Sequence, residues 1–435
     1  MKITFMGAGS TVFVRNVLGD CMLTELGKDC DIALYDIDGE RLKDSEIMLQ
    51  ALNQNINGGK ARIKGYLGIE NRRAALKGAD FVINAIQVGG YEPCTVTDFE
   101  IPKKFGLRQT IADTLGIGGI MRGLRTIPVL KDFAEDMQAV CPNAWFLNYV
   151  NPMAILTGYM LRFTGIKTVG LCHSVQVCAK ALMDGVGMEY DESVQWKIAG
   201  INHMAWLLEI TKDGKDLYPE IKRRSLENGA PDWDRVRHYI MHNFGYYVTE
   251  SSEHFSEYTP YFIKDKYPSL IEQFNIPLDE YPRRCVNQIN EWKQMRDQLT
   301  KDPTITHERS KEYGSYIIES ICLNKPYKIG GNIINNGLIE NLPDEACVEV
   351  PCLVDASGIC GTKVGRLPTQ LAALNMSNIA PQLLTIEAAV TGKKEYIYYA
   401  AMSDPHTSSE LSIDDTKKLV DALLEAHGDW LSAYH

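Results

Sequence analysis

The first forty residues carry a pattern that restricts the fold of this chain more than any other segment does. An apolar run over residues 3–6 ends in Gly7-Ala8-Gly9-Ser10, and apolar residues at helical spacing follow it. Residues 31–36 predict a second strand, which ends in the carboxylate of Asp36. A strand, a glycine turn, a helix and a parallel strand form a βαβ unit, whose helix N-terminus binds pyrophosphate through backbone N–H groups. We therefore predict a Rossmann-like nucleotide-binding domain at the N-terminus.

The nucleotide motif departs from the usual one, because Val12 stands where the third glycine is expected. Asp36 supports the assignment, since a carboxylate at this place accepts hydrogen bonds from ribose hydroxyls and repels a 2′-phosphate, which favours NAD over NADP. Two alternatives remain open: a strand–helix turn that binds no ligand, and an Asp36 that is only a solvated turn residue. The candidate cofactor-binding residues are Gly7, Gly9, Ser10, Thr11, Asp36 and Asn84.

Strands and helices continue to alternate as far as about residue 171. Apolar runs predict strands at 81–86 and 145–149, and apolar residues at helical spacing predict helices at 39–55 and 121–139. Such alternation is typical of parallel βαβ units, which are right-handed when they share a sheet. We therefore predict an α/β fold whose Rossmann-like, NAD-binding domain with a parallel sheet spans residues 1–195.

The rest of the chain has a different pattern. Residues 194–210 and 329–355 are β-like, and helices dominate elsewhere, including most of residues 370–427. We predict that residues 196–435 form an α+β domain that contributes to substrate binding, metal binding and oligomerisation.

Charge and cysteine usage exclude several classes of protein. The formal net charge of −11 argues against a nucleic-acid-binding surface or a polybasic membrane patch. No apolar stretch is long enough to span a bilayer, and the N-terminus lacks the layout of a signal peptide. The eleven cysteines show no repeating spacing and are odd in number, which fits reduced thiols rather than a disulfide framework. We therefore expect a cytoplasmic protein.

A cysteine and a histidine each lie beside an apolar run that predicts a strand. Cys172 follows the run at 169–171, and His203 precedes another one. A thiolate and an imidazole on neighbouring loops can together bind one divalent metal. The alternatives are a small buried hydrophobe for the cysteine and a hydrogen-bonded loop residue for the histidine.

Further polar residues follow other predicted strands or lie in glycine-rich loops. Asn148 and Asn151 offer amides to hydroxyl groups, although Pro152 also fits an Asx turn at this place. Asp113 precedes a glycine-rich segment, whose alternative interpretation is a flexible start of a helix.

Together these motifs resemble glycoside hydrolase family 4, the NAD- and metal-dependent glycosidases. The resemblance runs nearly from end to end. It rests on segments 7–10, 113–119, 148–152, 172–173, 202–203, 335–337 and 365–368. It implies a dehydrogenase-like architecture of the lactate or malate type, NAD and Mn²⁺ or another divalent metal as cofactors, and a homodimer or homotetramer.

The residues around the cysteine indicate a subgroup of this family. His173-Ser174-Val175 resembles the α-galactosidases, whereas members that act on phosphorylated sugars carry Asp or Asn after the cysteine. Those members also tend to have an arginine where this chain has Gln87. The resemblance implies hydrolysis of terminal α-D-galactosides of the melibiose and raffinose type. An α-glucosidase, an α-galacturonidase, a simple 2-hydroxy acid dehydrogenase and an NAD-sensing protein are the alternatives.

The family mechanism assigns roles to individual residues. Oxidation at C3 of the sugar acidifies the C2 proton, the aglycone leaves from C1, water adds, and C3 is reduced again. The resemblance implies Cys172 and His203 as metal ligands and His173 as an assisting acid. The base is Tyr246, Tyr247 or a metal-activated hydroxide. The candidate sugar-binding residues are Asn151, Asn148, Asp113 and Arg284, with Glu250, His254 and Glu257 as further candidates.

Overall fold

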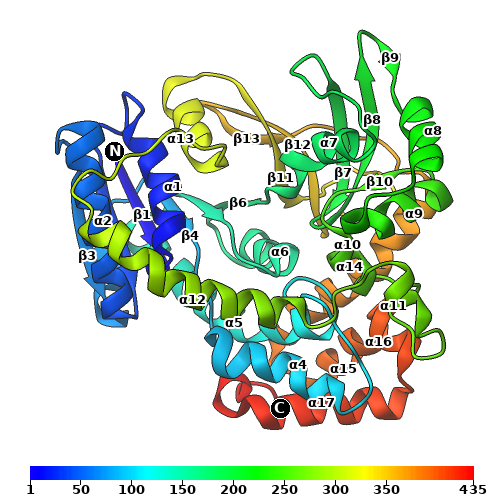
Figure 1. The fold of residues 1–435 in the computed structure, drawn as a ribbon. Helices are drawn as coiled ribbons and strands as arrows, with labels where there is room; N and C mark the ends of the chain where they lie inside the picture. Colours follow the sequence, from blue (N-terminus) through cyan, green and yellow to red (C-terminus); the bar gives the residue numbers. More distant parts are fainter.

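A computed structural model describes residues 1–435, and its strands all join one mixed sheet (Figure 1). Six parallel strands lie in the order β3-β2-β1-β4-β5-β6, which is the strand order of a dinucleotide-binding Rossmann fold. These strands are β1 (Lys2–Met6), β2 (Asp31–Asp36), β3 (Arg62–Leu67), β4 (Phe81–Asn84), β5 (Trp145–Asn148) and β6 (Lys167–Leu171). The predicted Rossmann-like α/β fold is confirmed.

The sheet continues past β6 as an antiparallel half. Strand β11 pairs with β6 at Gly331 and Asn332, and the order then runs β12-β7-β8-β10. The antiparallel strands are β7 (Gln195–Ile201), β8 (Met204–Lys212), β9 (Lys215–Asp216), β10 (Tyr247–Val248), β11 (Tyr327–Ile334), β12 (Cys347–Asp355) and β13 (Gly358–Gly361). The predicted division at residues 195 and 196 falls at the start of β7. It stays a prediction, because the sheet crosses it without a break.

Helices cover the parallel half and connect its strands. They are α1 (Thr11–Met22), α2 (Gly39–Asn57), α3 (Arg72–Leu76), α4 (Val96–Lys103), α5 (Gly116–Val140), α6 (Met153–Phe163) and α7 (Ser174–Gly185). Helix α5 begins five residues before the predicted start at 121. Glycines at 116, 118 and 119 fill its first turn, and they weaken the helical signal there.

Some of the remaining helices lie beside the antiparallel half, two reach back to the parallel half, and the last ones form the C-terminal layer (Figure 1). They are α8 (Tyr218–Asn228), α9 (Arg235–Phe244), α10 (Ser252–Glu257), α11 (Ser269–Gln273), α12 (Glu280–Lys301), α13 (Tyr313–Leu323), α14 (Thr369–Thr391), α15 (Lys394–Ser403), α16 (Pro405–Glu410) and α17 (Ile413–His427). Short turns of helix lie at η1 (Ile69–Asn71), η2 (Gly90–Thr95), η3 (Asp232–Asp234) and η4 (Gly428–Leu431). No helix has the length and apolar content needed to cross a membrane.

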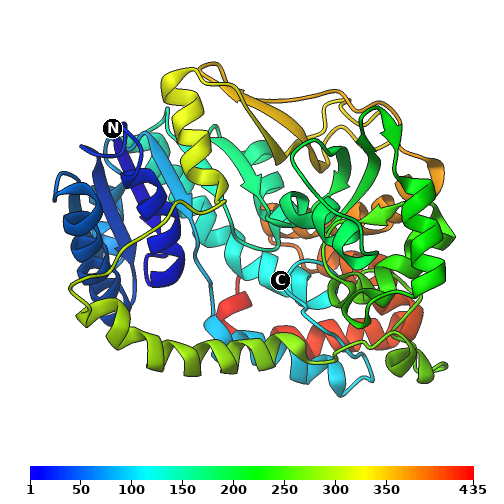
Figure 2. The ribbon, with the colours of Figure 1, turned by 45° about the horizontal axis from the view of Figure 1, so that its top comes forward.

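Long-range contacts hold the two halves in a fixed arrangement. Helix α12 crosses the molecule as a long strap (Figure 2), and Arg296 near its end forms ion pairs with Glu40 and Asp44 of α2. The largest apolar cluster includes Phe5 from β1 and Trp206 from β8, so the hydrophobic core also runs through both halves. This packing sets the carboxyl ends of the parallel strands against the loops of the antiparallel half.

Candidate active site

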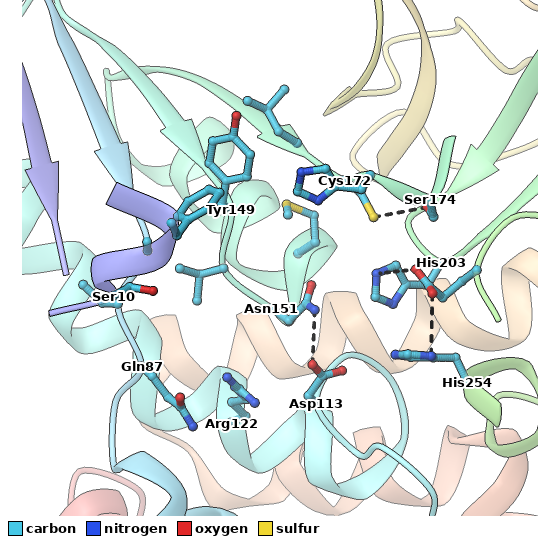
Figure 3. Close-up of a pocket in the computed structure, with 18 residues that line it drawn as sticks. Ser10, Gln87, Asp113, Arg122, Tyr149, Asn151, Cys172, Ser174, His203 and His254 are labelled. Atoms are coloured by element: carbon cyan, nitrogen blue, oxygen red, sulfur yellow. Dashed lines mark hydrogen bonds and ion pairs between the residues drawn. The ribbon is translucent and has the colours of Figure 1, made fainter. Parts of the chain in front are cut away.

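A cavity of about 440 Å³ lies where these strand ends meet the antiparallel half (Figure 3). Open α/β sheets bind their ligands at this edge, because the loops that follow parallel strands converge there. The lining residues are Ser10, Phe13, Ala85, Ile86, Gln87, Asp113, Arg122, Tyr149, Val150, Asn151, Met153, Leu171, Cys172, His173, Ser174, His203, Glu250 and His254. The cavity thus contains most of the chemically reactive residues that the sequence predicts.

Three metal-binding groups converge on one side of this cavity. Cys172 follows β6, His203 occupies the turn between β7 and β8, and Glu250 follows β10. Their ligand atoms all lie within 4.8 Å of one another. His203 Nε2 is 3.4 Å from Glu250 Oε2, while Nδ1 of the same ring is 3.2 Å from the Tyr258 hydroxyl. A contact on the second nitrogen orients a ligating imidazole, so this geometry fits a metal-binding histidine.

The electrostatics of the three groups also fit a cation. Burial raises the pKa of the Cys172 thiol, so a nearby positive charge is needed to make it a thiolate. Burial would also raise the pKa of Glu250, but the neighbouring imidazoles of His203 and His254 and the backbone N–H of Ser251 outweigh it and lower that pKa to about 2. Glu250 is therefore a carboxylate. A thiolate, an imidazole and a carboxylate together suit a divalent transition metal.

A second cavity, of about 420 Å³, follows the glycine turn of the βαβ unit. A Cβ added at Gly7 would lie 2.6 Å from the Ala85 carbonyl oxygen, and one added at Gly9 would lie 2.9 Å from Asp36 Oδ2. The Gly9 N–H donates to the same oxygen at 2.6 Å. Gly7 also has φ of +86°, a backbone conformation that favours glycine. Both glycines are therefore required by close packing, and the turn leaves the cavity free beside Asp36.

The two cavities lie next to each other. Both are lined by Ser10, Ala85, Ile86 and Gln87, which belong to the loops after β1 and β4. A dinucleotide in the second cavity can therefore extend one end toward the metal-binding groups. This arrangement brings a redox cofactor and a Lewis acid to one substrate.

Polar residues beside the metal-binding groups suit the hydroxyl groups of a sugar. Asn151 Nδ2 donates to Asp113 Oδ2 at 3.2 Å, and Arg122 lies beside them (Figure 3). Burial would raise the pKa of Asp113, but the Arg122 guanidinium lowers it, with smaller contributions from the nearby imidazoles of His254 and His203. Asp113 therefore stays a carboxylate and can accept hydrogen bonds from hydroxyls.

His173 lies at the rim of the cavity, where its side chain is 51% exposed. Its Nε2 is 2.6 Å from Glu312 Oε2, and this hydrogen bond raises the pKa of His173 although burial opposes it. The loop that carries Glu312 is fixed to helix α1, because the Ser310 N–H and hydroxyl both donate to buried Asp20. A carboxylate thus orients the candidate acid.

Comparison with known proteins gives the family. Residues 2–188 match the family model described as family 4 glycosyl hydrolase, and residues 198–407 match the model of the C-terminal domain of the same family. The chain belongs to family 4 of the glycosyl hydrolases. The resemblance inferred from the sequence motifs is confirmed.

Relatives of this family 4 hydrolase span its full length. An α-galactosidase of Bacillus subtilis (strain 168) is 61% identical over 434 residues, which cover 100% of this chain and 99% of the relative. A 6-phospho-α-glucosidase from gut microorganisms, solved in complex with NAD and Mn²⁺, is 20% identical and covers 99% of this chain and 98% of its own, with a TM-score of 0.79. Malate dehydrogenase from Plasmodium falciparum is 15% identical over 91% of this chain and 99% of its own, with a TM-score of 0.53, so the predicted dehydrogenase-like architecture is confirmed.

Neither predicted tyrosine base lines the cavity, so this expectation is corrected by the structure. Tyr247 is fully buried, and its hydroxyl donates to Asp234 within the packing of helices α7 to α9. Tyr246 packs against Tyr218, with ring centroids 5.9 Å apart. Strand β10 begins at Tyr247 and pairs with β8, which buries the Tyr247 ring in the interior of the antiparallel half. Tyr246, immediately before this strand, is half-buried.

Four other predicted site residues hold the scaffold together instead of lining a cavity. Asn84 and Asn148 hydrogen-bond to each other, and the Thr11 hydroxyl lies 2.7 Å from the Ser45 hydroxyl. Arg284 of helix α12 forms ion pairs with Glu280 of the same helix and with Glu253 of helix α10. In contrast, Gly7, Gly9, Ser10 and Asp36 line the nucleotide cavity, and Asp113, Asn151, Cys172, His173 and His203 line the first cavity.

Sequence reasoning missed part of the site. It named Glu250 only as a sugar contact, although Glu250 completes the metal-binding group. It did not single out Arg122 or Glu312. Arg122 lies inside a predicted helix without a local motif, and only the fold brings Glu312 to His173.

Proposed function

We propose that this family 4 hydrolase is an α-galactosidase that releases terminal α-D-galactosyl groups from substrates such as melibiose and raffinose, with NAD⁺ and Mn²⁺ as cofactors. The observation that carries this proposal is that the nucleotide cavity shares four lining residues with the cavity that contains Cys172, His203 and Glu250. The 61% identity to a full-length α-galactosidase supports galactose as the sugar.

The residues present fit both cofactors. Gly7, Gly9 and Asp36 would hold the dinucleotide, and Cys172 and His203, with Glu250 as a third ligand, would hold the metal. When bound, NAD⁺ accepts a hydride from C3 and later returns it, while the metal polarises the C3 oxygen so that the C2 proton becomes acidic.

The chain itself positions the sugar and moves its protons. Asp113, Asn151 and Arg122 bind hydroxyl groups and hold C2 near the metal-binding groups. Because both tyrosines lie outside the cavity, we propose that His254 removes the C2 proton. The Ser251 hydroxyl lies 2.7 Å from His254 Nδ1 and orients the ring. Burial lowers the pKa of His254 although Glu250 opposes the shift, which favours the neutral imidazole that a base requires. His173 delivers a proton to the leaving oxygen.

A panel of nitrophenyl glycosides, assayed with NAD⁺, Mn²⁺ and a thiol reductant, tests the choice of sugar. We expect the α-galactoside to exceed the α-glucoside and the α-galacturonide in kcat/KM by at least about 100-fold. A site that hydrogen-bonds the hydroxyl groups of galactose discriminates strongly against the C4 epimer and against a carboxylate at C6. A preference for either of the other two glycosides would assign the chain to a different specificity within the same mechanism.

Replacing Glu312 by Gln tests the role of His173. Without the carboxylate the imidazole loses its orienting partner, so hydrolysis of melibiose should slow by about 10- to 100-fold. Hydrolysis of p-nitrophenyl α-galactoside should change less than about threefold, because nitrophenolate leaves without protonation. Glu319→Gln is the matched control, since Glu319 pairs with Arg309 instead of His173. Equal slowing of both substrates by Glu312→Gln would remove His173 from the role of acid.

The proposal extends to the working form of the enzyme. We propose a cytoplasmic location, which fits a site that depends on the free thiol of Cys172. A homodimer or homotetramer stays a proposal that rests on the family resemblance. We also retain, as a proposal, the division into an NAD-binding domain at residues 1–195 and a substrate- and metal-binding domain at residues 196–435.

A further inference from the structure

Glu257 is a buried carboxylate that the reaction does not use directly. It ends helix α10, is 2% exposed and does not line the catalytic cavity. Buried carboxylates are costly unless their oxygens accept hydrogen bonds. Its partners therefore indicate what it does.

Three consecutive backbone N–H groups donate to this carboxylate. Thr110 N lies 2.7 Å from Oε2, Ala112 N lies 2.8 Å from Oε1, and Ile111 N lies between them at 3.2 and 3.3 Å from the two oxygens. The Thr110 hydroxyl also donates to the Glu253 carbonyl oxygen at 2.7 Å. Helix α10 thus holds the loop at residues 110–112 through four hydrogen-bonding groups.

The loop has a conformation that needs such support. Ala112 has φ of +52°, in the left-handed region that a residue with a Cβ seldom adopts. The next residue is Asp113, whose carboxylate accepts from Asn151 within the cavity. A bond to the Ala112 N–H fixes the backbone immediately before Asp113, and therefore the direction of its side chain.

We propose that Glu257 is a positioning residue that aims the Asp113 carboxylate at the substrate by clamping the backbone of residues 110–112. The same helix carries His254 on the cavity wall, so one short element sets both the candidate base and the hydroxyl-binding carboxylate. This inference rests on the proposed galactosidase function, because Asp113 is assigned to bind the sugar.

Glu257→Gln tests the clamp, since the amide has nearly the same size but turns an NH₂ group toward the backbone donors. We expect KM for α-galactosides to rise and kcat/KM to fall by about 10- to 100-fold, as the loss of one or two backbone hydrogen bonds implies. Galactose affinity, measured by calorimetry, should fall in parallel. NAD⁺ affinity and the thermal midpoint should stay near those of the wild type. Glu253→Gln is the control, because that side chain of the same helix pairs with Arg284.

A double-mutant cycle with Asp113→Asn separates positioning from general structural damage. If Glu257 acts through Asp113, adding Glu257→Gln to Asp113→Asn should change kcat/KM by less than about threefold, because the two effects are then not additive. Full additivity, or wild-type KM and galactose affinity in Glu257→Gln, would overturn the inference. If the Gln variant does not fold, Glu257→Asp keeps the charge but shortens the clamp, and the same criteria apply. A wild-type enzyme without α-galactosidase activity would instead refute the proposed function.

Discussion

Cys172→Ser should abolish α-galactosidase activity and weaken Mn²⁺ binding by more than about 100-fold. Mutating a residue that only hydrogen-bonds to a metal ligand already lowers metal affinity or activity by about 10- to 100-fold, and loss of the ligand itself should cost more. A hydroxyl is a much poorer metal ligand than a thiolate. Serine is nearly the same size as cysteine, so the packing around residue 172 should change little. The fold should therefore survive, because the substitution leaves Ser174, His203 and Glu250 in place.

Cys178→Ser provides the control for this variant. Cys178 is equally buried on helix α7 and lies outside the cavity, so its replacement tests the cost of a buried hydroxyl alone. Near-wild-type activity and Mn²⁺ affinity are expected for Cys178→Ser. If Cys172→Ser bound Mn²⁺ with wild-type affinity, the assignment of Cys172 as a metal ligand would be wrong.

Removal of NAD⁺ should stop turnover completely, because oxidation at C3 precedes cleavage of the glycosidic bond. Enzyme dialysed free of nucleotide and treated with EDTA should recover activity only when both NAD⁺ and Mn²⁺ are added back. NADH should not accumulate during turnover, since the hydride returns to C3 in each cycle. Full activity in EDTA without NAD⁺ contradicts the mechanism, and stoichiometric NADH formation would indicate a simple dehydrogenase.

The parallel half of the fold was predictable because its signals are local. The glycine turn at residues 7–10 and the carboxylate of Asp36 lie within one βαβ unit, so short-range patterns define them. The antiparallel continuation was not predictable in the same way. Strand β11 pairs with β6 across about 160 residues of sequence, and periodicity does not specify such long-range partners. Strand β3 was also missed, because its exposed edge position gives it a weak apolar pattern.

The candidate site shows the same division between local and long-range information. Cys172 and His203 follow from residue type and place, since each lies beside a predicted strand. Glu312 and Glu257 act through contacts with residues more than 130 positions away, which no motif indicates. Tyr247 was wrongly expected at the cavity, because its local sequence fits a buried strand as well as a cavity wall. Only the pairing of β10 with β8 shows that the residue belongs to a buried strand.

Hydrolysis of an α-galactoside in D₂O distinguishes the elimination mechanism from direct displacement at C1. Removal of the C2 proton by His254 and its replacement from solvent should leave deuterium at C2 of the released galactose, which NMR of the product detects. A glycosidase that uses two carboxylates never breaks the C2–H bond. We predict deuterium at C2 in nearly every product molecule, and a product that stays protonated at C2 would contradict the elimination pathway even with NAD⁺ bound.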